Sequence, residues 1–163
     1  MAVEDKYTDE NIVAGKKASA LKTGSGTKVV TLVGTVSVAA GDDDGSVYRV
    51  FSNIPSSLVP VSVVVHNTAI TAGTDYDFGL YEGNLGAVVD KDILADGISM
   101  ASARTVATIN NAGLTTIALG DIKTLGELSA QTDVDSAYDL AFTANTVGTA
   151  SGTIRVTATF AYL

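Results

Sequence analysis

Apolar and polar residues alternate along most of this chain from Val29 onward, with the period of two that a β-strand requires. The stretch "VVTLVGTVSVAA" begins at Val29, alternates along its length and ends at the turn cluster "GDDDGS". The C-terminal "SGTIRVTATFAYL" alternates as regularly, and one of its faces carries Ile154, Val156, Ala158 and Phe160. Because successive side chains of a strand point to opposite faces, both stretches predict strands with one buried face.

Two stretches between these also predict strands. In "VYRVFSNI", one face carries Val47, Arg49 and Phe51, and the other carries Tyr48, Val50 and Ser52. The next stretch, "LVPVSVVVHN", is a continuous apolar run, which is typical of a strand covered on both sides. Pro60 lies inside this run and cannot donate a ladder hydrogen bond, so it predicts an edge position or a bulge near the start of the strand.

A Tyr-Asp motif occurs twice, in "AGTDYDFGLYEGNLG" and further along in "DSAYDLAFTANTVG". Read as strands, the two copies superpose, and their apolar faces carry Tyr76, Phe78 and Leu80 in one copy and Tyr138, Leu140 and Phe142 in the other. The small residues Gly79 and Ala141 lie on the opposite face. The repeat is either a chemical site built twice or two core-facing strands of one sandwich, and the alternation favours core strands.

The region between the two copies predicts a loop, two strands and one helix. "GAVVDKDILADGISMAS" predicts a loop and a strand, and "RTVATINNAGLTTIAL" predicts a further strand. In "GDIKTLGELS", Asp121 is the expected cap of a helix of one or two turns with apolar positions at Ile122, Leu125 and Leu128. Seven to eight short strands with Gly- and Asp-rich turns predict an all-β fold, a single β-sandwich that is jelly-roll-like, over residues 29–163.

Residues 1–28 lack a sustained period and predict a flexible, extended N-terminal arm. This arm holds five of the ten basic residues and four acidic ones. Residues 29–163 carry the other five basic residues and fourteen acidic ones, a net charge of 5 − 14 = −9. The split suits an arm lying on an oppositely charged partner, and an undocked linker is the alternative. The candidate partner-binding residues of the arm are Lys16, Lys17, Lys22 and Lys28.

Composition narrows the class of function. The 163 residues suit one domain, and a net charge of −8 argues against a nucleic-acid partner. With no Cys, the chain has no disulfide, thiolate nucleophile or Cys-based zinc site. The longest apolar run is too short to span a membrane, and the N-terminus lacks the apolar segment of a secretory signal. We therefore expect synthesis in a cytoplasm and no membrane partner.

The residues that could carry metal or nucleophilic chemistry are few. His66 is the one histidine in the sequence and follows an apolar run, so we expect a strand-end residue bonded to a turn, not a triad or zinc ligand. Two acidic clusters could offer oxygen ligands to Ca²⁺: Asp42, Asp43 and Asp44, and Asp90, Asp92 and Asp96. The second departs from the spacing of an EF-hand loop and lacks its final Glu. Turn chemistry is the favoured interpretation of both clusters.

Three further patterns resemble motifs of enzymes, but each lacks a feature that the enzyme class requires. Asp77 and Asp139 follow equivalent tyrosines and could be the paired carboxylates of a glycoside hydrolase, but the chain has no Trp to form a sugar platform. "GSGTK" lacks the spacing of a phosphate-binding loop, and "SALK" lies in the arm without the companion motifs of Ser-x-x-Lys enzymes. We therefore expect no enzyme, no cofactor and no metal.

The stretch "VYRVFSNIPSSLVPVSVVVHNTAITAGTDYDFGLYEGNLGAVVD" resembles a group of small structural proteins of tailed bacteriophages, encoded near the major capsid protein. The resemblance rests on an apolar strand, an "N-I-P" turn, a second apolar strand, the segment "T-A-G-T-x-Y-D-x-G-L-Y" and a Gly-rich turn before "A-V-V-D". The later "YDLAFTANTVGTASGTIRV" is similar to the C-terminal part of the same group. The resemblance spans roughly residues 30–163. The arm before it is not distinctive.

This resemblance implies a capsid decoration, or cement, protein of the virion. Such a protein is a β-sandwich on the outer capsid surface, where homotrimers bridge subunits of the major capsid protein and stabilise the shell. Three alternatives stay open. A head- or tail-fibre component that binds host surface glycans would be favoured by exposed aromatic residues such as Tyr48, Tyr81 or Tyr162. A bacterial glycan-binding or surface-layer module would carry a secretion signal, and a glycosidase would need a catalytic pair.

Overall fold

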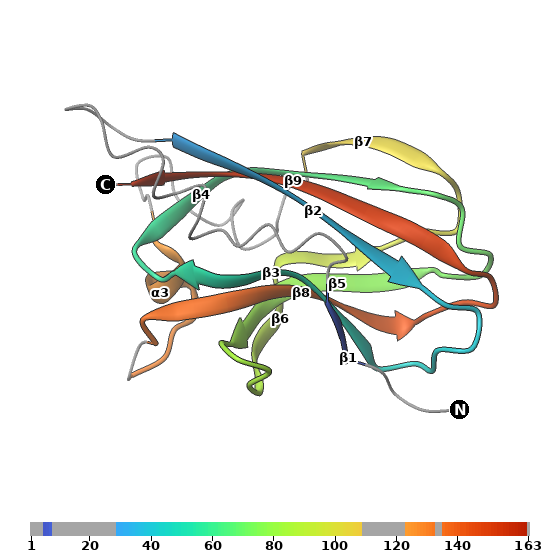
Figure 1. The fold of residues 1–163 in the computed structure, drawn as a ribbon, viewed down its shortest axis with the longest axis horizontal. Coiled ribbons are helices and arrows are strands. Elements are labelled where there is room, and N and C mark those ends of the chain that lie inside the picture. Colours follow the sequence, from blue (N-terminus) through green and yellow to red (C-terminus); the bar gives the residue numbers. More distant parts are fainter. Residues whose placement is uncertain (1–4, 8–28, 109–122, 133–134, 163) are drawn as a thin grey trace.

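The computed structural model describes residues 5–7, 29–108, 123–132 and 135–162, which Figure 1 shows as strands and one short helix. The elements in these ranges are β1 (Asp5–Tyr7), β2 (Val29–Val38), β3 (Ser46–Pro55), β4 (Leu58–Asn67), β5 (Asp75–Glu82), β6 (Val88–Ile98), β7 (Arg104–Thr108), α3 (Leu125–Leu128), β8 (Ala137–Thr146) and β9 (Gly152–Tyr162). Strands dominate, as the alternating pattern predicts.

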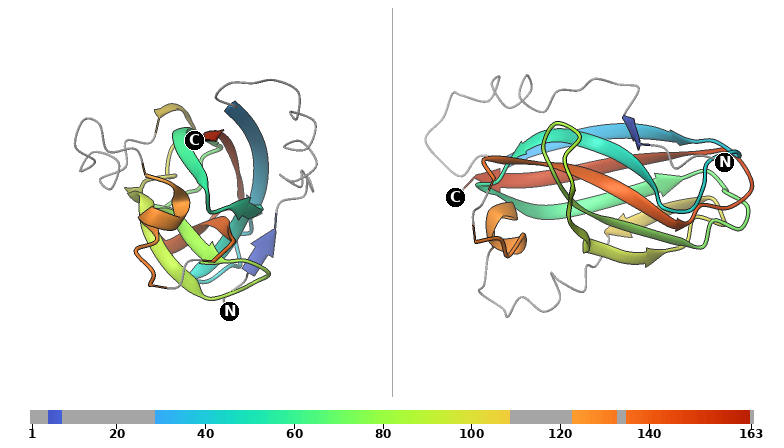
Figure 2. Two further views of the ribbon diagram at one scale, coloured as in Figure 1. Left: turned by 90° about the vertical axis from the view of Figure 1, so that its left-hand side faces the viewer. Right: turned by 90° about the horizontal axis from the view of Figure 1, so that it is seen from below.

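The topology follows from four nested antiparallel pairs: β2 with β9, β3 with β8, β4 with β7, and β5 with β6. The chain from β2 to β9 is thus one long antiparallel ribbon rolled into two layers. Rolling places β9 beside β4 and β8 beside β5. The resulting sheets have the orders β2-β9-β4-β7 and β1-β3-β8-β5-β6, and they face each other in Figures 1 and 2. This is a jelly-roll sandwich, which confirms the predicted fold class.

The two copies of the Tyr-Asp motif are neighbouring strands of one sheet. β5 and β8 are antiparallel, with Phe78 opposite Phe142 and Leu80 opposite Leu140. The Phe78 and Phe142 rings lie 4.5 Å apart between centroids, a distance at which aromatic pairs contribute beyond their buried area. All four side chains are fully buried between the sheets. The prediction of two core-facing strands is confirmed.

A bulge in β3 changes the face on which Phe51 lies. The alternation predicts Phe51 on the same face as Arg49, but the pairing with β8 shifts between these two residues. The extra residue turns Phe51 into the core beside Val50, and both are buried. The predicted shared face of Arg49 and Phe51 is therefore wrong, because a bulge inverts the alternation on its far side.

Strand β4 is bulged at its start and covered on one side. Its pairing with β9 shifts between Pro60 and Ser62, which confirms the predicted bulge at this proline. Val61 in between is 56% exposed, and Val64 is half-buried. The expectation of a strand covered on both sides is wrong, since the outer face of β4 borders solvent beyond its first residues.

The helix begins later than predicted. The cap of α3 is Thr124, whose hydroxyl accepts from the Glu127 backbone N–H while the Glu127 side chain accepts from the Thr124 N–H. This reciprocal capping box makes Thr124 the cap in place of Asp121, which corrects the prediction. Leu125 and Leu128 are buried, as expected, and residues 121 and 122 lie outside the described residues.

Part of the N-terminal arm is described as a strand. β1 pairs in parallel with the edge strand β3, with Asp5 opposite Val47 and Tyr7 opposite Arg49. The candidate lysines Lys16, Lys17, Lys22 and Lys28 lie outside the described residues. Their role, and the boundary of the arm at residue 28, stay predictions.

Membrane insertion through a helix finds no support in the described part of the chain. No helix there is long and apolar enough to cross a bilayer.

Candidate functional site

The two acids of the repeated motif lie on the outer face of the β3-β8-β5-β6 sheet. Asp77 and Asp139 are 2% and 1% exposed, although their strand neighbours fill the core on the other side. Strand β6 and the turn before it cover this face, since a Cβ atom at Gly79 would overlap the backbone of Asp90 and Lys91. The small residue at position 79 therefore admits the β6 backbone, and both carboxylates are enclosed beneath or beside it.

Asp139 is neutralised by a buried arginine. Its Oδ2 accepts from Nη1 of Arg49 at 3.2 Å, and its Oδ1 accepts from the Asn53 backbone N–H at 2.9 Å. The Arg49 guanidinium also donates to the Gly86 carbonyl oxygen and lies 4.9 Å from the centroid of the Tyr81 ring. Arg49 therefore joins β3, β8 and the β5–β6 turn through one fully buried side chain.

Asp77 is held by three donors from different elements. Its Oδ2 lies 3.0 Å from Nζ of Lys91 and accepts from the Asn145 amide at 2.7 Å, while Oδ1 accepts from the Gly97 N–H. Burial alone would raise the pKa of Asp77, but these hydrogen bonds and the lysine charge outweigh it and hold the pKa below its usual value. The neighbouring Asp96 shows the opposite effect, because a hydrogen bond with Asp77 raises the pKa of Asp96.

These contacts argue against a hydrolytic pair at Asp77 and Asp139. A glycosidase needs one carboxylic acid with a raised pKa as proton donor and a second, accessible carboxylate. Here Asp77 has a lowered pKa and bonds to three donors, and Asp139 is buried against Arg49. The arrangement binds strands together, which supports the interpretation of the motif as scaffold.

The Asp42–Asp44 cluster shapes the turn between β2 and β3. Asp42 accepts from the Ala39 N–H and from the Tyr48 hydroxyl. The Asp43 carbonyl oxygen accepts from Ser46, and the Asp44 carboxylate accepts from the Val147 N–H in the adjacent β8–β9 turn. These bonds are turn chemistry, as the sequence favours.

The Asp90–Asp96 cluster lies on β6 and its bulge. Asp90 accepts from the Asp92 N–H, an Asx-type turn contact. Burial, together with hydrogen bonding and charge from Asp92, raises the pKa of Asp90. Among the described residues, no group of three or more His, Cys, Asp or Glu side chains is arranged to hold a metal ion. The cluster therefore supplies no argument for Ca²⁺.

The single histidine and the tyrosines are placed as structural residues. His66 is the penultimate residue of β4, half-buried on the outer face between Thr105 of β7 and Arg155 of β9. Tyr48 and Tyr81 are buried, the latter with its hydroxyl bonded to Thr143. Tyr162 is partly buried against the core. These tyrosines form no exposed aromatic patch of the kind a glycan-binding face would need.

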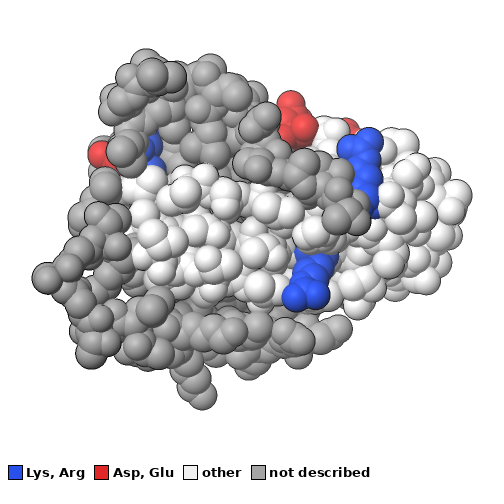
Figure 3. Space-filling view, turned by 90° about the horizontal axis from the view of Figure 1, so that it is seen from above, with Lys and Arg blue, Asp and Glu red and all other residues white. Residues whose placement is uncertain are grey.

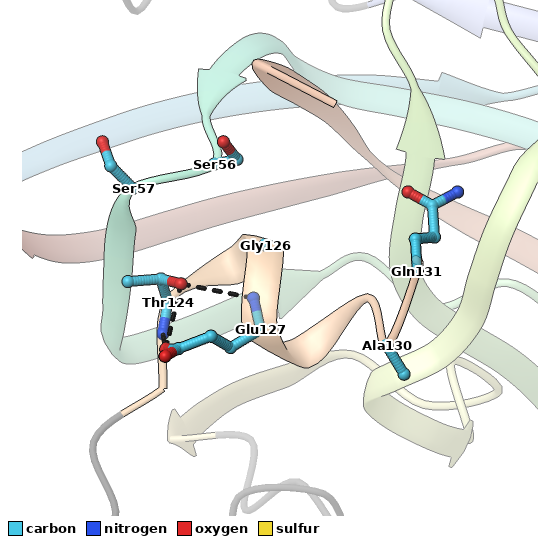
Figure 4. A pocket seen from close by; sticks show the side chains of 7 residues that line it. All are labelled: Ser56, Ser57, Thr124, Gly126, Glu127, Ala130 and Gln131. Carbon is cyan, nitrogen blue, oxygen red and sulfur yellow. Dashed lines mark hydrogen bonds between the residues drawn. The ribbon is translucent and has the colours of Figure 1, made fainter. Parts of the chain in front are cut away.

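A shallow, open depression lies beside α3 (Figure 4). Its lining consists of Ser56, Ser57, Thr124, Gly126, Glu127, Ala130 and Gln131. The one carboxylate there, Glu127, is engaged in the capping box, and the Thr124 backbone N–H lowers the pKa of Glu127. The Gln131 side-chain oxygen accepts from the Tyr138 hydroxyl. Thr124, Glu127 and Gln131 therefore serve local structure at this depression.

The outer face of the β2-β9-β4-β7 sheet is a candidate binding surface that no chemical motif in the sequence indicated. None of the 36 residues of β2, β4, β7 and β9 is acidic, although the chain holds 18 Asp and Glu residues. The outer face of this sheet carries Thr, Ser and Val side chains together with Arg155 and His66. In Figure 3 the described atoms on this side are mostly uncharged, with basic side chains among them and acidic side chains only at the edge of the view. The absence of Asp and Glu can be read from the sequences of these four strands, but their period of two indicates only which face of each strand is apolar.

Comparison with known proteins relates the fold to phage capsids. No protein-family model matches this sequence, and no curated protein matches it. Solved structures of phage capsids do match in fold. A chain of the cyanophage Pam1 capsid asymmetric unit aligns with a TM-score of 0.56 and 14% identity, covering 86% of this chain and 89% of that one.

A chain of the Ralstonia phage GP4 capsid aligns with a TM-score of 0.59 and 11% identity, covering 83% of this chain and 85% of that one. This chain shares their fold. The match extends over most of both partners, so it concerns the whole jelly roll and not a fragment of sheet. At these identities it carries no residue-level correspondence.

Proposed function

We propose that this protein is a phage capsid decoration protein, which binds the outer surface of the head and stabilises the shell by bridging subunits of the major capsid protein. The observation that supports this most strongly is the jelly roll itself, shared over more than four fifths of its length with chains from two phage capsids. The independent resemblance of the sequence to phage structural proteins points the same way.

The buried polar groups also suit a structural role. The carboxylates of Asp77 and Asp139 accept hydrogen bonds that connect neighbouring strands, and the acids of the β2–β3 loop accept hydrogen bonds that shape that loop. Among the described residues, no buried side-chain nitrogen or oxygen lacks a hydrogen-bond partner. A catalytic site commonly leaves such groups available for a substrate.

The proposal includes the assembly in which the protein acts. We infer a homotrimer on the outer capsid surface, with the major capsid protein as its partner and the lysines of the arm, Lys16, Lys17, Lys22 and Lys28, among the contacts. A bridging protein stabilises a shell by mass action, because it binds the assembled lattice and not the separated subunits. No cofactor takes part in this function.

The copy number of the protein in purified virions tests the proposal directly. Quantitative mass spectrometry against the major capsid protein should give a ratio of one or a simple fraction of one. A handful of copies per particle would contradict lattice decoration and indicate a vertex or fibre component. Absence from the particle would overturn the proposal altogether.

A further inference from the structure

Charge is segregated between the two layers of the sandwich. The sheet β2-β9-β4-β7 contains no acidic residue, whereas the described acids of the body lie in the other sheet, in the loops that flank its strands, including the β2–β3 turn, and in α3. Around Lys91, the carboxylates of Asp75, Asp77 and Asp92 all act on its charge from the β5–β6 side. In Figure 1, β6 lies on the side of the molecule opposite β2 and β9. The outer face of the β2-β9-β4-β7 sheet, called the acid-free face below, is therefore well separated from the acidic β5–β6 side.

The acid-free face is built of rows of short side chains that cross three strands. Thr157 in the centre lies between Val33 of β2 and Val64 of β4. The next row places Arg155 between Thr35 and His66, and a third places Thr159 between Thr31 and Ser62. The Thr31 and Thr159 hydroxyls are hydrogen-bonded to each other at 3.1 Å. Exposed side chains on this face include Val29, Val61 and Arg155.

Such a face suits contact with another protein. Strands β2, β9 and β4 of ten or eleven residues, spaced about 4.8 Å apart with about 3.3 Å per residue, cover roughly 450 Å², and β7 widens the sheet further. This is a large part of the roughly 800 Å² that each partner contributes to a standard interface. Thr, Ser and Val lose little side-chain entropy on burial, so ordering them at an interface costs less than ordering long polar chains.

We propose that the outer face of the β2-β9-β4-β7 sheet is the surface by which the sandwich docks on the capsid shell, with the acidic β5–β6 side turned away. This inference rests on the proposed function. The partner it fits is a flat protein surface with carboxylates placed opposite Arg155 and the neighbouring His66. Because like charges placed opposite each other cost several kcal/mol, a protein of net charge −8 meets least repulsion from an acidic partner through its acid-free face.

Charge variants of the full-length chain test the docking face on shells assembled from the major capsid protein. Arg155→Glu and Thr157→Glu place a carboxylate on the face, whereas Arg155→Lys keeps the positive charge. Leu85→Glu is the matched control for Thr157→Glu, because it adds the same charge at an exposed position, 56% accessible, in the β5–β6 turn. Thermal unfolding establishes that each variant is folded, and co-sedimentation with shells over a range of concentrations measures affinity.

We expect the two face variants to weaken shell binding at least about tenfold, and the Lys and Leu85 variants to bind like the wild type. Raising the salt concentration should weaken wild-type binding. Equal binding by folded Thr157→Glu, Arg155→Glu and wild type would overturn the docking face and leave the decoration function standing. Failure of the wild type to bind shells would overturn the function itself. Loss of self-association with unchanged shell binding would assign the face to contacts between copies and also overturn the inference.

Discussion

Arg49 and Asp139 form an ion pair between the neighbouring strands β3 and β8, with 3.2 Å between Nη1 and Oδ2 and side chains 2% and 1% exposed. The equivalent acid in the first copy of the Tyr-Asp motif, Asp77, pairs instead with Lys91, whose side chain is 44% exposed. The same motif position therefore carries a buried pair in one strand and a pair at the surface in the other. The difference predicts unequal consequences when each acid is removed.

Asp139→Ala should destabilise the fold by about 3 to 5 kcal/mol, because it removes a charged acceptor from the fully buried Arg49 guanidinium. Asp77→Ala should cost less, since the Lys91 ammonium can return to water. Urea unfolding followed by circular dichroism measures both. The double variant Arg49→Met with Asp139→Leu should recover most of the loss, because it buries no charge at all. Equal destabilisation by Asp139→Ala and Asp77→Ala would contradict this account.

Gly79→Ala should destabilise the protein by at least about 1 to 3 kcal/mol, the range for overpacking in a tight site. The added Cβ would overlap the carbonyl oxygen of Asp90 and the backbone of Lys91, and a backbone cannot move aside as a flexible side chain can. Gly41→Ala is the matched control, since its Cβ would meet no atom within 4 Å. It should leave stability unchanged or raise it slightly by restricting the unfolded chain. Similar midpoints for the two variants in thermal unfolding would show that β6 does not lie tightly on β5.

The fold was predictable because its information lies in local alternation. Strands β2 and β9 bury every second side chain, and in β5 and β8 the large apolar side chains alternate although both faces are buried. A period of two in the sequence therefore identifies both the strand and its core face. Nested pairing of such strands leads to few topologies other than a sandwich. The misplaced Phe51 shows the limit of this reasoning. One irregularity between Arg49 and Phe51 moves Phe51 to the core face, and a second one before Ile54 restores the original alternation, although the local sequence pattern shows neither.

The cap of α3 carries a signal in the sequence that the expected cap at Asp121 does not have. Asp121 and Thr124 are both good cap residues, but only Thr124 is followed three positions later by Glu, the capping-box spacing. The Arg49–Asp139 pair had no such signal, because its members lie 90 positions apart and meet only through the register of β3 and β8. Long-range polar contacts depend on the finished fold, so local sequence patterns do not predict them.

The lowered pKa of Asp77 predicts how stability depends on pH. A carboxyl group whose folded pKa lies below its unfolded value contributes stability above the unfolded value, about 3.9, and this contribution is lost as the pH falls through the folded pKa. Asp77→Asn should therefore be less stable than the wild type at neutral pH and approach it in acid. Urea unfolding at pH values from 7 down to 2 measures the difference. Parallel curves for the two proteins would show that Asp77 contributes nothing through its charge.

Asp96 serves as a control for Asp77, because its pKa is shifted in the opposite direction. Its pKa is raised by Asp77, so its ionisation costs stability at neutral pH, and this cost disappears as the pH falls through the raised folded value. Asp96→Asn should therefore be slightly more stable than the wild type at pH 7 and equal to it in acid. The same pH series measures this effect, and a loss of stability at pH 7 would show that Asp96 acts as a hydrogen-bond partner and not as a repelling charge.

The N-terminal arm should contribute to shell binding and little to the stability of the sandwich. Its described strand, β1, spans three residues and pairs with β3 at the edge of the sheet, where few bonds are lost on removal. Replacing Lys16, Lys17, Lys22 and Lys28 by Gln keeps β1 and removes only charge, so it separates the electrostatic role of the arm from its pairing. We expect lower occupancy on shells for this variant and for deletion of residues 1–28, with thermal unfolding midpoints close to the wild type. Undiminished occupancy of both variants would leave the arm as a linker, and unfolding of the deletion variant would make it part of the domain.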